Sequence, residues 1–163
     1  MVGAVLIDLK KAFNSVWHEG LLFKLHKLNA PLTFIKLINN LISNTKFRVS
    51  IGKLLSLKIF VNRKGLPQGT VNSPSLFNIF TAKLNNLFGM NSVRGAYSMT
   101  FADDQIEYFA EKSHNEIKKP LQKLYDQTDG YYESWKLVIN PKKCETILFR
   151  GPLSDKSRKE RKN

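Results

Sequence analysis

The chain has 163 residues, enough for one domain with a substantial core but hardly for two. Hydrophobic residues make up 42% of it, including eleven Phe, which excludes an intrinsically disordered chain. A formal net charge of +13 and a pI near 9.9 favour a polyanionic partner, nucleic acid before membrane, although a solvated basic surface would have the same composition.

Cys144 is the one cysteine, so no internal disulfide can form, and we expect a reducing intracellular compartment, nuclear or cytoplasmic. The opening MVGAVLIDLKKAF has too short an apolar run before Asp8 for a signal peptide or a membrane span, and no membrane partner is expected. Because the chain starts almost directly in a predicted buried strand, we expect it to be a fragment of a longer protein.

Residues 2–9 are almost continuously apolar apart from Asp8, a pattern typical of a central strand that is buried on both faces. A buried carboxylate needs a cation or hydrogen-bond donors beside it, so Asp8 indicates either a metal ligand or a cap for the following turn. Apolar residues at helical spacing then predict helices over 21–28 and 34–42. Alternating apolar residues on either side of Gly52-Lys53 predict a hairpin over 47–61.

Residues 63–74, RKGLPQGTVNSP, combine two Gly and two Pro with little side-chain bulk and predict a loop. Ser73 and Pro74 predict the start of a helix, with Ser73 as the N-cap and Pro74 at the first helical position. The buried face of this helix is expected to run from Leu76 to Leu87 and Phe88.

Residues 97–109, YSMTFADDQIEYF, alternate apolar and polar side chains on both sides of a break, which predicts a half-buried hairpin with Tyr97, Met99 and Phe101 on its apolar face. Asp103 and Asp104 are adjacent at its tip. Asp is common in turns, and taken alone the stretch favours a polar turn. Two hard oxygen donors held at a strand end would also suit Mg²⁺.

After the hairpin, Ser113 and Glu116 have the spacing of a capping box, and apolar residues predict a helix onward to Trp135. Pro120 either kinks this helix or marks its first turn. Residues 144–149 predict a last short strand. Residues 150–163 have almost no apolar side chains and are expected to form a flexible basic tail.

Nucleotidyl transfer would explain three separated features: Asp8, the loop from Gly65 to Gly69, and the Asp103-Asp104 pair. In this reaction a hydroxyl attacks a triphosphate in line, and two metal ions about 3.5–4 Å apart activate the attacking oxygen and neutralise the leaving group. The protein has to supply carboxylates from neighbouring strands and a surface of small residues against a base pair. The three Asp residues meet the first need, and the loop meets the second.

Four stretches of the chain resemble motifs of reverse transcriptases, in that family's order. VLIDLKKAF resembles the first carboxylate motif, D-x-x-K-A-F, and GLPQGTVNSPSLFNIF resembles the LPQG-x-x-x-SP-x-LFN-I-F motif. FADDQ resembles the Y/F-A-D-D box, and WKLVINPKKCETILF resembles the next motif, W-x-L-x-I-N-x-x-K-T/C-E. Together they cover most of residues 2–150, and their form is most similar to reverse transcriptases of non-LTR, LINE-like retrotransposons.

The resemblance implies an α+β fold over residues 1–149, an antiparallel palm-type sheet backed by helices. It implies an RNA-directed DNA polymerase that uses two Mg²⁺ ions, or Mn²⁺, and binds an RNA template, a DNA primer and a dNTP. Asp8 and Asp103 would be the main metal ligands, with Asp104 beside them. Lys143 would be a proton donor to pyrophosphate, unless it is an ordinary surface lysine.

The same resemblance implies contacts with nucleotides. Phe13 stands where the family has an aromatic residue that excludes a ribose 2′-OH, although core packing explains a Phe equally well. Gln68 and Gly69 match the loop that lies against the nascent base pair, and Phe101 and Ala102 match residues near the primer terminus. Asn14 stands where the family usually has Asp, for which we expect an effect on structure or on the surroundings of the ligands.

Two interpretations remain open. The chain is the palm core of an RNA-directed DNA polymerase, as the intact Asp8, Asp103 and Asp104 indicate, or it is a degenerate retroelement fragment that binds nucleic acid without catalysis. No fingers segment before Asp8, thumb after Arg150 or endonuclease is recognisable in the sequence. We therefore expect the isolated chain to have little or no polymerase activity.

Overall fold

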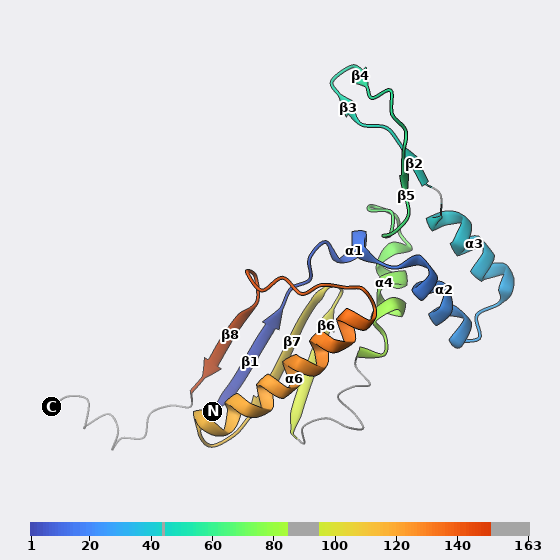
Figure 1. Cartoon of the computed structure of the whole chain (residues 1–163). Coiled ribbons are helices and arrows are strands. Elements are labelled where there is room, and N and C mark those ends of the chain that lie inside the picture. The colour runs from blue at the N-terminus through green and yellow to red at the C-terminus, as the bar shows by residue number, and fades with distance from the viewer. Residues whose placement is uncertain (44, 85–94, 151–163) are drawn as a thin grey trace.

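The computed structural model describes residues 1–43, 45–84 and 95–150. At its centre is a four-stranded antiparallel sheet with the strand order β6-β7-β1-β8 (Figure 1). Its strands are β1 (Val2–Ile7), β6 (Ala96–Phe101), β7 (Asp104–Ala110) and β8 (Glu145–Phe149). β1 lies between β7 and β8, which explains its nearly continuous apolar sequence. The expected α+β fold with an antiparallel sheet is confirmed.

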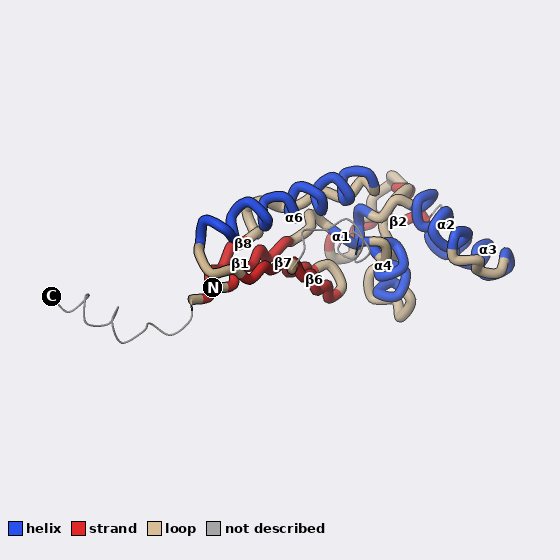
Figure 2. The backbone as a smooth tube through the Cα atoms, turned by 90° about the horizontal axis from the view of Figure 1, so that it is seen from below, coloured by secondary structure: helices blue, strands red, loops and turns tan. Residues whose placement is uncertain are grey.

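Helix α6 (His114–Ser134) covers one face of this sheet, as Figure 2 shows. The two layers approach closely at Gly3, where an added Cβ would lie 2.4 Å from Cγ2 of Ile117 and 2.8 Å from Cδ1 of Leu121. The predicted capping box is confirmed, because the side chains of Ser113 and Glu116 each accept a hydrogen bond from the other's backbone N–H. Pro120 lies inside α6, so the alternative that it marks the first turn is wrong.

The opposite face of the sheet is left uncovered by the helices of the described residues (Figure 2). Tyr97, Met99 and Phe101 are 56%, 62% and 84% exposed. The alternation correctly predicted a hairpin, but the expectation that the apolar face of β6 would be buried is wrong. The buried positions on the neighbouring strand β7 are instead Gln105, Glu107 and Phe109.

Within the described ranges, four helices pack beyond the end of the sheet where β1 ends (Figure 1). They are α1 (Ala12–Ser15), α2 (His18–Lys27), α3 (Leu32–Ile42) and α4 (Ser73–Thr81). Their core contains the fully buried Leu21, Phe77 and Phe80. Lys24 of α2 is buried as well: its Nζ donates hydrogen bonds to the Phe80 carbonyl oxygen and the Tyr131 hydroxyl and lies 3.7 Å from the centroid of the Trp135 ring. Lys24 thereby joins α2, α4 and α6.

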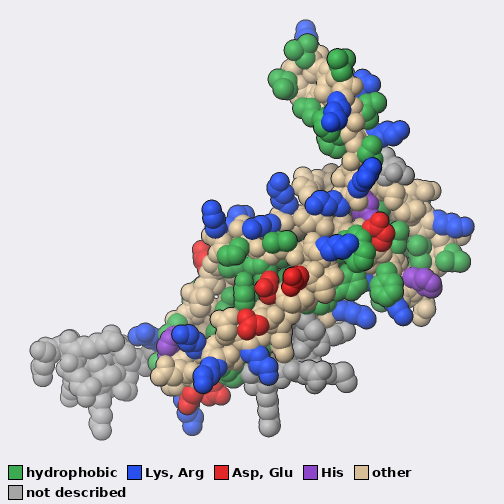
Figure 3. Space-filling model, viewed as in Figure 1, with side chains coloured by type: hydrophobic (Ala, Val, Ile, Leu, Met, Phe, Trp, Pro, Cys, Tyr) green, Lys and Arg blue, Asp and Glu red, His purple; other side chains and the backbone are tan. Residues whose placement is uncertain are grey.

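A long two-stranded hairpin, which we call the arm (residues 45–62), projects away from this body (Figure 1). It contains two short strand pairs, β2 (Thr45–Phe47) with β5 (Phe60–Asn62), and β3 (Ser50–Ile51) with β4 (Leu54–Leu55). The predicted hairpin over 47–61 is confirmed. Its surface displays apolar side chains together with Lys and Arg (Figure 3), and Ile51, Leu54 and Leu57 are 77%, 79% and 98% exposed.

The start of α4 differs from the prediction by one residue. Asn72, not Ser73, is the N-cap, so Pro74 occupies the second helical position. The Ser73 hydroxyl is used differently: it donates a hydrogen bond of 2.6 Å to the Pro67 carbonyl oxygen and so ties the preceding loop to the helix. Leu87, Phe88 and the tail from 151 to 163 lie outside the described residues. No helix in the described ranges is long and apolar enough to cross a bilayer.

Candidate polymerase site

Asp8 and Asp104 lie opposite each other at the ends of two neighbouring strands. β1 pairs with β7 from Val2↔Ala110 to Ile7↔Gln105, and this register, continued by one residue, places Asp8 across from Asp104. Asp103 precedes Asp104 in the turn between β6 and β7. The fold therefore brings Asp8 to the strand end that carries the predicted carboxylate pair.

Asp8, Asp104 and Lys143 line one groove of about 870 Å³. The Asp8 carboxylate accepts a hydrogen bond of 3.2 Å from Nδ2 of Asn140, and Nζ of Lys143 lies 3.6 Å from its Oδ2. The backbone N–H of Asn140 also donates to the Asp8 carbonyl oxygen at 2.8 Å. Asn140 was not among the residues singled out from the sequence; the contact shows that the NPKK turn is built around Asp8.

The three carboxylates do not form a complete set of metal ligands in this conformation. In the described ranges, no three Asp, Glu, His or Cys side chains are grouped so that they could hold a metal ion. Asp103 is not among the residues that line the groove, whereas Asp8 and Asp104 are. Their oxygen donors nevertheless fit Mg²⁺, since this ion is commonly held by one or two carboxylates, with waters and substrate phosphates completing the shell.

The turn that carries Asp103 is tight. Phe101 pairs with Asp104, so only Ala102 and Asp103 connect the two strands. Ala102 has a φ of 54°, in the left-handed region that residues with a Cβ rarely occupy outside such turns. The short connection fixes Asp103 and Asp104 at the tip of the hairpin, and Phe101 is exposed beside them.

The LPQG loop docks onto α1 through its backbone. The N–H of Gly65 donates to the Val16 carbonyl oxygen at 2.7 Å, and that of Leu66 donates to the Phe13 carbonyl oxygen at 2.8 Å. Nε2 of His18 donates to the Gly65 carbonyl oxygen at 2.7 Å. Gly65 is required here because its φ is 88° and an added Cβ would lie 2.7 Å from Cα of Asn14.

Phe13, Gln68 and Gly69 line a common hollow of about 450 Å³. The Phe13 ring also stacks on Phe77, with ring centroids 4.7 Å apart, so it packs against the core and faces the hollow. Nε2 of Gln68 donates a hydrogen bond of 3.2 Å to Oδ1 of Asn14. Asn14 thus retains the acceptor oxygen that an Asp would offer to Gln68.

A third hollow shares lining residues with each of the other two. It lies between α4 and the β6–β7 turn and is lined by Pro74 and Asn78 on one side and by Phe101 and Ala102 on the other. Pro74 also lines the hollow of Gln68, and Phe101 also lines the groove of Asp8. All the predicted site residues except Asp103 therefore line one or more of three depressions, and neighbouring depressions share Phe101 or Pro74.

A buried polar network lies beneath this site, between β7 and α6. Oε1 of Glu107 accepts hydrogen bonds from Nε2 of Gln105, at 2.8 Å, and from the hydroxyl of Thr128. The Tyr132 hydroxyl donates to Oε1 of Gln105 at 2.6 Å. Burial raises the pKa of the Glu107 carboxyl to about 7, against which the Thr128 hydrogen bond acts, and burial also raises the pKa of Tyr132. Sequence reasoning missed this network, although a Glu at an inward-facing strand position was a clue.

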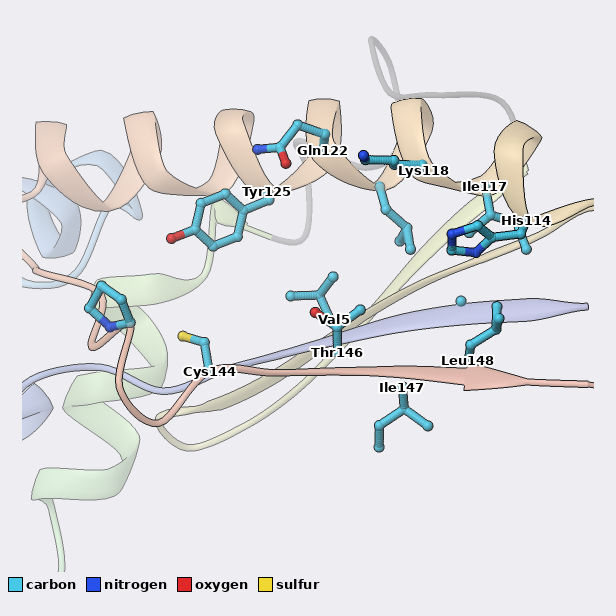
Figure 4. A pocket seen from close by; sticks show the side chains of 13 residues that line it. Val5, His114, Ile117, Lys118, Gln122, Tyr125, Cys144, Thr146, Ile147 and Leu148 are labelled. Carbon is cyan, nitrogen blue, oxygen red and sulfur yellow. The ribbon is translucent and has the colours of Figure 1, made fainter.

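A separate cavity of about 500 Å³ lies between α6 and strands β1 and β8 (Figure 4). Tyr125 and Gln122 border it from the helix, and Cys144 and Thr146 from the opposite wall. It is on the α6 side of the sheet, and neither Asp8 nor the Asp103-Asp104 pair lines it. The cavity is therefore distinct from the carboxylate groove.

Comparison with known proteins gives one consistent family. The family described as "Reverse transcriptase (RNA-dependent DNA polymerase)" matches residues 2–162. The probable RNA-directed DNA polymerase from transposon BS of Drosophila melanogaster is 32% identical over 157 residues, which are 93% of this chain and 17% of that protein. The RNA-directed DNA polymerase from mobile element jockey of Drosophila funebris is 32% identical over 158 residues, 94% of this chain and 17% of the relative. The chain thus spans less than a fifth of the length of these curated relatives.

Solved structures share the fold at low sequence identity. Apo telomerase from Candida tropicalis, truncated from its C-terminal domain, matches with a TM-score of 0.70 at 14% identity, over 94% of this chain and 32% of the telomerase. Telomerase from Candida albicans, in complex with a TWJ fragment of telomeric RNA, also has a TM-score of 0.70, at 12% identity over 93% of this chain and 27% of that one. With the match to residues 2–162 and the relatives from mobile elements, these findings mean that the chain belongs to the reverse transcriptase family, among the domains of non-LTR retrotransposons.

Proposed function

We propose that this chain is the palm of an RNA-directed DNA polymerase that adds a dNTP to the 3′-OH of a DNA primer on an RNA template. The observation that carries the proposal is the position of Asp8 opposite Asp104, at the ends of neighbouring strands and in a groove that Lys143 also lines. In the reaction the primer 3′ oxygen attacks the α-phosphorus, the bond to the pyrophosphate breaks, and the attacking hydroxyl loses its proton to solvent.

Asp8, Asp103 and Asp104 would hold two Mg²⁺ ions, for which Mn²⁺ could substitute. When bound, such ions activate the attacking oxygen and neutralise charge on the leaving group. Lys143 would donate a proton to the departing pyrophosphate. Its position supports this role, because its ammonium group lies 3.6 Å from Asp8 and its side chain is 67% exposed, free to reach a bound triphosphate.

The hollows would hold the substrates. Phe13, fixed by its stacking on Phe77, would exclude a ribose 2′-OH, while Gln68 and Gly69 would lie against the nascent base pair. Phe101 and Ala102, at the hairpin tip, would contact the primer terminus.

The distribution of charge supports binding of a nucleic-acid backbone. Between Glu19 and Asp103 the sequence has no Asp or Glu, but it has eleven Lys and Arg residues. This segment includes α3, α4, the arm and the LPQG loop. The RNA complex of the structurally similar Candida albicans telomerase supports the proposal of an RNA template, and the proposed setting is intracellular, nuclear or cytoplasmic.

Primer extension in a chimera tests the proposal. Residues 1–150 would replace the matched segment of the jockey polymerase of Drosophila funebris, and extension of an oligo(dT) primer on poly(rA) would be measured in Mg²⁺. We expect activity in the chimera and a loss of at least 100-fold in Asp8→Asn and Asp103→Asn, since an amide keeps the shape of the carboxylate but not its charge. A folded chimera that binds RNA but extends no primer would favour the degenerate fragment instead.

A further inference from the structure

The Glu107 network is attached to the hairpin that carries the carboxylates. Gln105 directly follows Asp104, and its backbone is paired with Ile7 on one side and Thr100 on the other. Ile7 in turn directly precedes Asp8. Gln105 therefore lies in the row of residues next to both strand ends of the proposed metal site.

The side-chain amide of Gln105 is held by hydrogen bonds to three side chains. Its oxygen accepts from the Tyr132 hydroxyl at 2.6 Å, and its nitrogen donates to Oε1 of Glu107 at 2.8 Å and to the Ser98 hydroxyl at 3.3 Å. A flipped amide would place the oxygen of Gln105 against Oε1 of Glu107, which already accepts from the Thr128 hydroxyl, and the bond donated by the amide nitrogen would be lost. Buried and hydrogen-bonded on both ends, the amide ties β7 to α6 immediately behind Asp104.

The network is a costly way to pack a helix on a sheet. Glu107 and Thr128 have no exposed surface, and Oε2 of Glu107 is buried without a hydrogen-bond partner among the described residues. Apolar side chains would pack this interface without that penalty. A satisfied amide, in contrast, holds a strand end in one position, and metal ligands have to be held within a fraction of an ångström to bind well.

We propose that Glu107, Thr128 and Tyr132 are positioning residues for the carboxylate hairpin, acting through the side chain of Gln105. The proposal rests on the function proposed above, since it assumes that Asp8, Asp103 and Asp104 bind the cation. None of the network residues has to touch the cation or the substrate. Their effect is to hold the start of β7 against α6, so that the turn keeps Asp103 and Asp104 beside Asp8.

Three variants of the chain separate positioning from packing. Tyr132→Phe removes only the hydroxyl that orients Gln105, and Glu107→Leu removes the acceptor of the amide nitrogen. Glu107→Gln is the conservative variant, because its amide oxygen can still accept from Gln105 and Thr128. Ser113→Ala is the matched control, since it removes the cap at the far end of α6 and lowers stability without touching the network.

Two measurements would be made on each purified variant: the Kd for Mn²⁺ by electron paramagnetic resonance, and hydrogen–deuterium exchange of the peptide that covers residues 98–107. We expect Tyr132→Phe and Glu107→Leu to weaken Mn²⁺ binding at least fivefold and to speed exchange in the hairpin. Glu107→Gln should stay within twofold of the unmodified chain, and Ser113→Ala should change neither quantity. Unchanged binding and unchanged exchange in both disruptive variants would overturn the proposal.

The design also distinguishes this proposal from the function on which it rests. Asp8→Asn and Asp103→Asn should abolish Mn²⁺ binding in the same assay. If they do not, or if the unmodified chain binds no Mn²⁺, the assignment of the metal site fails. Hydrogen exchange then decides the positioning role by itself: faster exchange of the hairpin in Tyr132→Phe and Glu107→Leu but not in Ser113→Ala supports it, and equal exchange in all variants refutes it.

Discussion

Glu107 is buried as an acid between sheet and helix, and this makes stability depend on pH. Burial raises its pKa from 4.5 to about 7, so between these values the folded chain holds a proton that the unfolded chain has lost. The free energy of unfolding therefore falls as pH rises through this window, by about 3 kcal/mol at most, and above pH 7 the full cost of burying an ionised carboxylate is present. Glu107→Gln removes this ionisable group. The variant should therefore gain more stability, relative to the unmodified chain, at pH 8 than at pH 5.

Urea denaturation at the two pH values measures this difference. Glu133→Gln, at an exposed position of α6, is the control and should show the same small change at both. If Glu107→Gln changed the free energy of unfolding equally at pH 5 and pH 8, burial would not raise the pKa of Glu107, and the prediction would be wrong.

Lys143 affects the cation site through its charge. Its ammonium group lies 3.6 Å from Asp8, where it competes with a metal ion for the same carboxylate. Lys143→Met should therefore tighten Mn²⁺ binding by up to about sevenfold, which corresponds to the Coulomb energy of about 1.2 kcal/mol between two unit charges at this distance in a water-like dielectric. Lys142→Met is the control, because Lys142 lines the same groove without pairing to Asp8. Weaker binding in Lys143→Met would show that the lysine organises Asp8 and does not compete for it.

At the scale of elements, the contact of α6 with β1 depends on the absence of a side chain at Gly3. Gly3→Ala would push its Cβ into Ile117 and Leu121, which should cost about 1–3 kcal/mol of stability. Gly130→Ala, inside α6 with open space around it, should instead stabilise the chain by about 0.5–1 kcal/mol. Chemical denaturation of the two Gly→Ala variants checks the opposite signs. A neutral Gly3→Ala would mean that the helix can shift away from the sheet at little cost.

Local patterns predicted most elements because they depend on neighbouring residues. The strand before Asp8, the capping box of α6 and the hairpin around Asp103 follow from spacing alone. Spacing does not predict which side of the sheet α6 covers. That side is decided by contacts between β7 and residues more than twenty positions away, such as Thr128 and Tyr132. For this reason the exposure of Met99 could not be read from its alternation.

In the candidate site, too, some features could be predicted from the sequence, and others depend on tertiary contacts. Motif resemblance predicted roles for individual residues, and the structure adds that Phe13, Gln68 and Gly69 share a hollow. The hydrogen bond from Asn140 to Asp8 joins residues that are distant in sequence, so no spacing could predict it. The placement of Ser73 inside α4 depends on the Pro67 carbonyl oxygen, a tertiary partner that an N-cap preference does not include.

At the scale of the whole molecule, charge is separated along the chain. The acidic residues lie before Gly20 and after Ala102, and the arm between them displays Lys46, Arg48 and Lys58 on an exposed ribbon with apolar neighbours (Figure 3). A two-stranded ribbon of this kind is marginally stable by itself, and its exposed apolar surface is typical of a binding element. We expect the arm to contact the backbone of the template.

Neutralising the arm tests this expectation. A variant with Lys46→Gln, Arg48→Gln and Lys58→Gln removes three cations that would release counterions on binding. The slope of log K against log salt for a single-stranded RNA should therefore become shallower by about 2, with weaker affinity at low salt.

The control is a triple variant on the exposed side of α6 that lowers the net charge equally, with Lys118→Gln, Lys119→Gln and Lys123→Gln. Fluorescence anisotropy between 50 and 200 mM KCl, on the order of physiological ionic strength, measures both slopes. If the slope of log K against log salt becomes shallower by the same amount in both triple variants, RNA binding depends on net charge alone and the arm does not contact the RNA. A change confined to the arm variant places the RNA backbone along the arm.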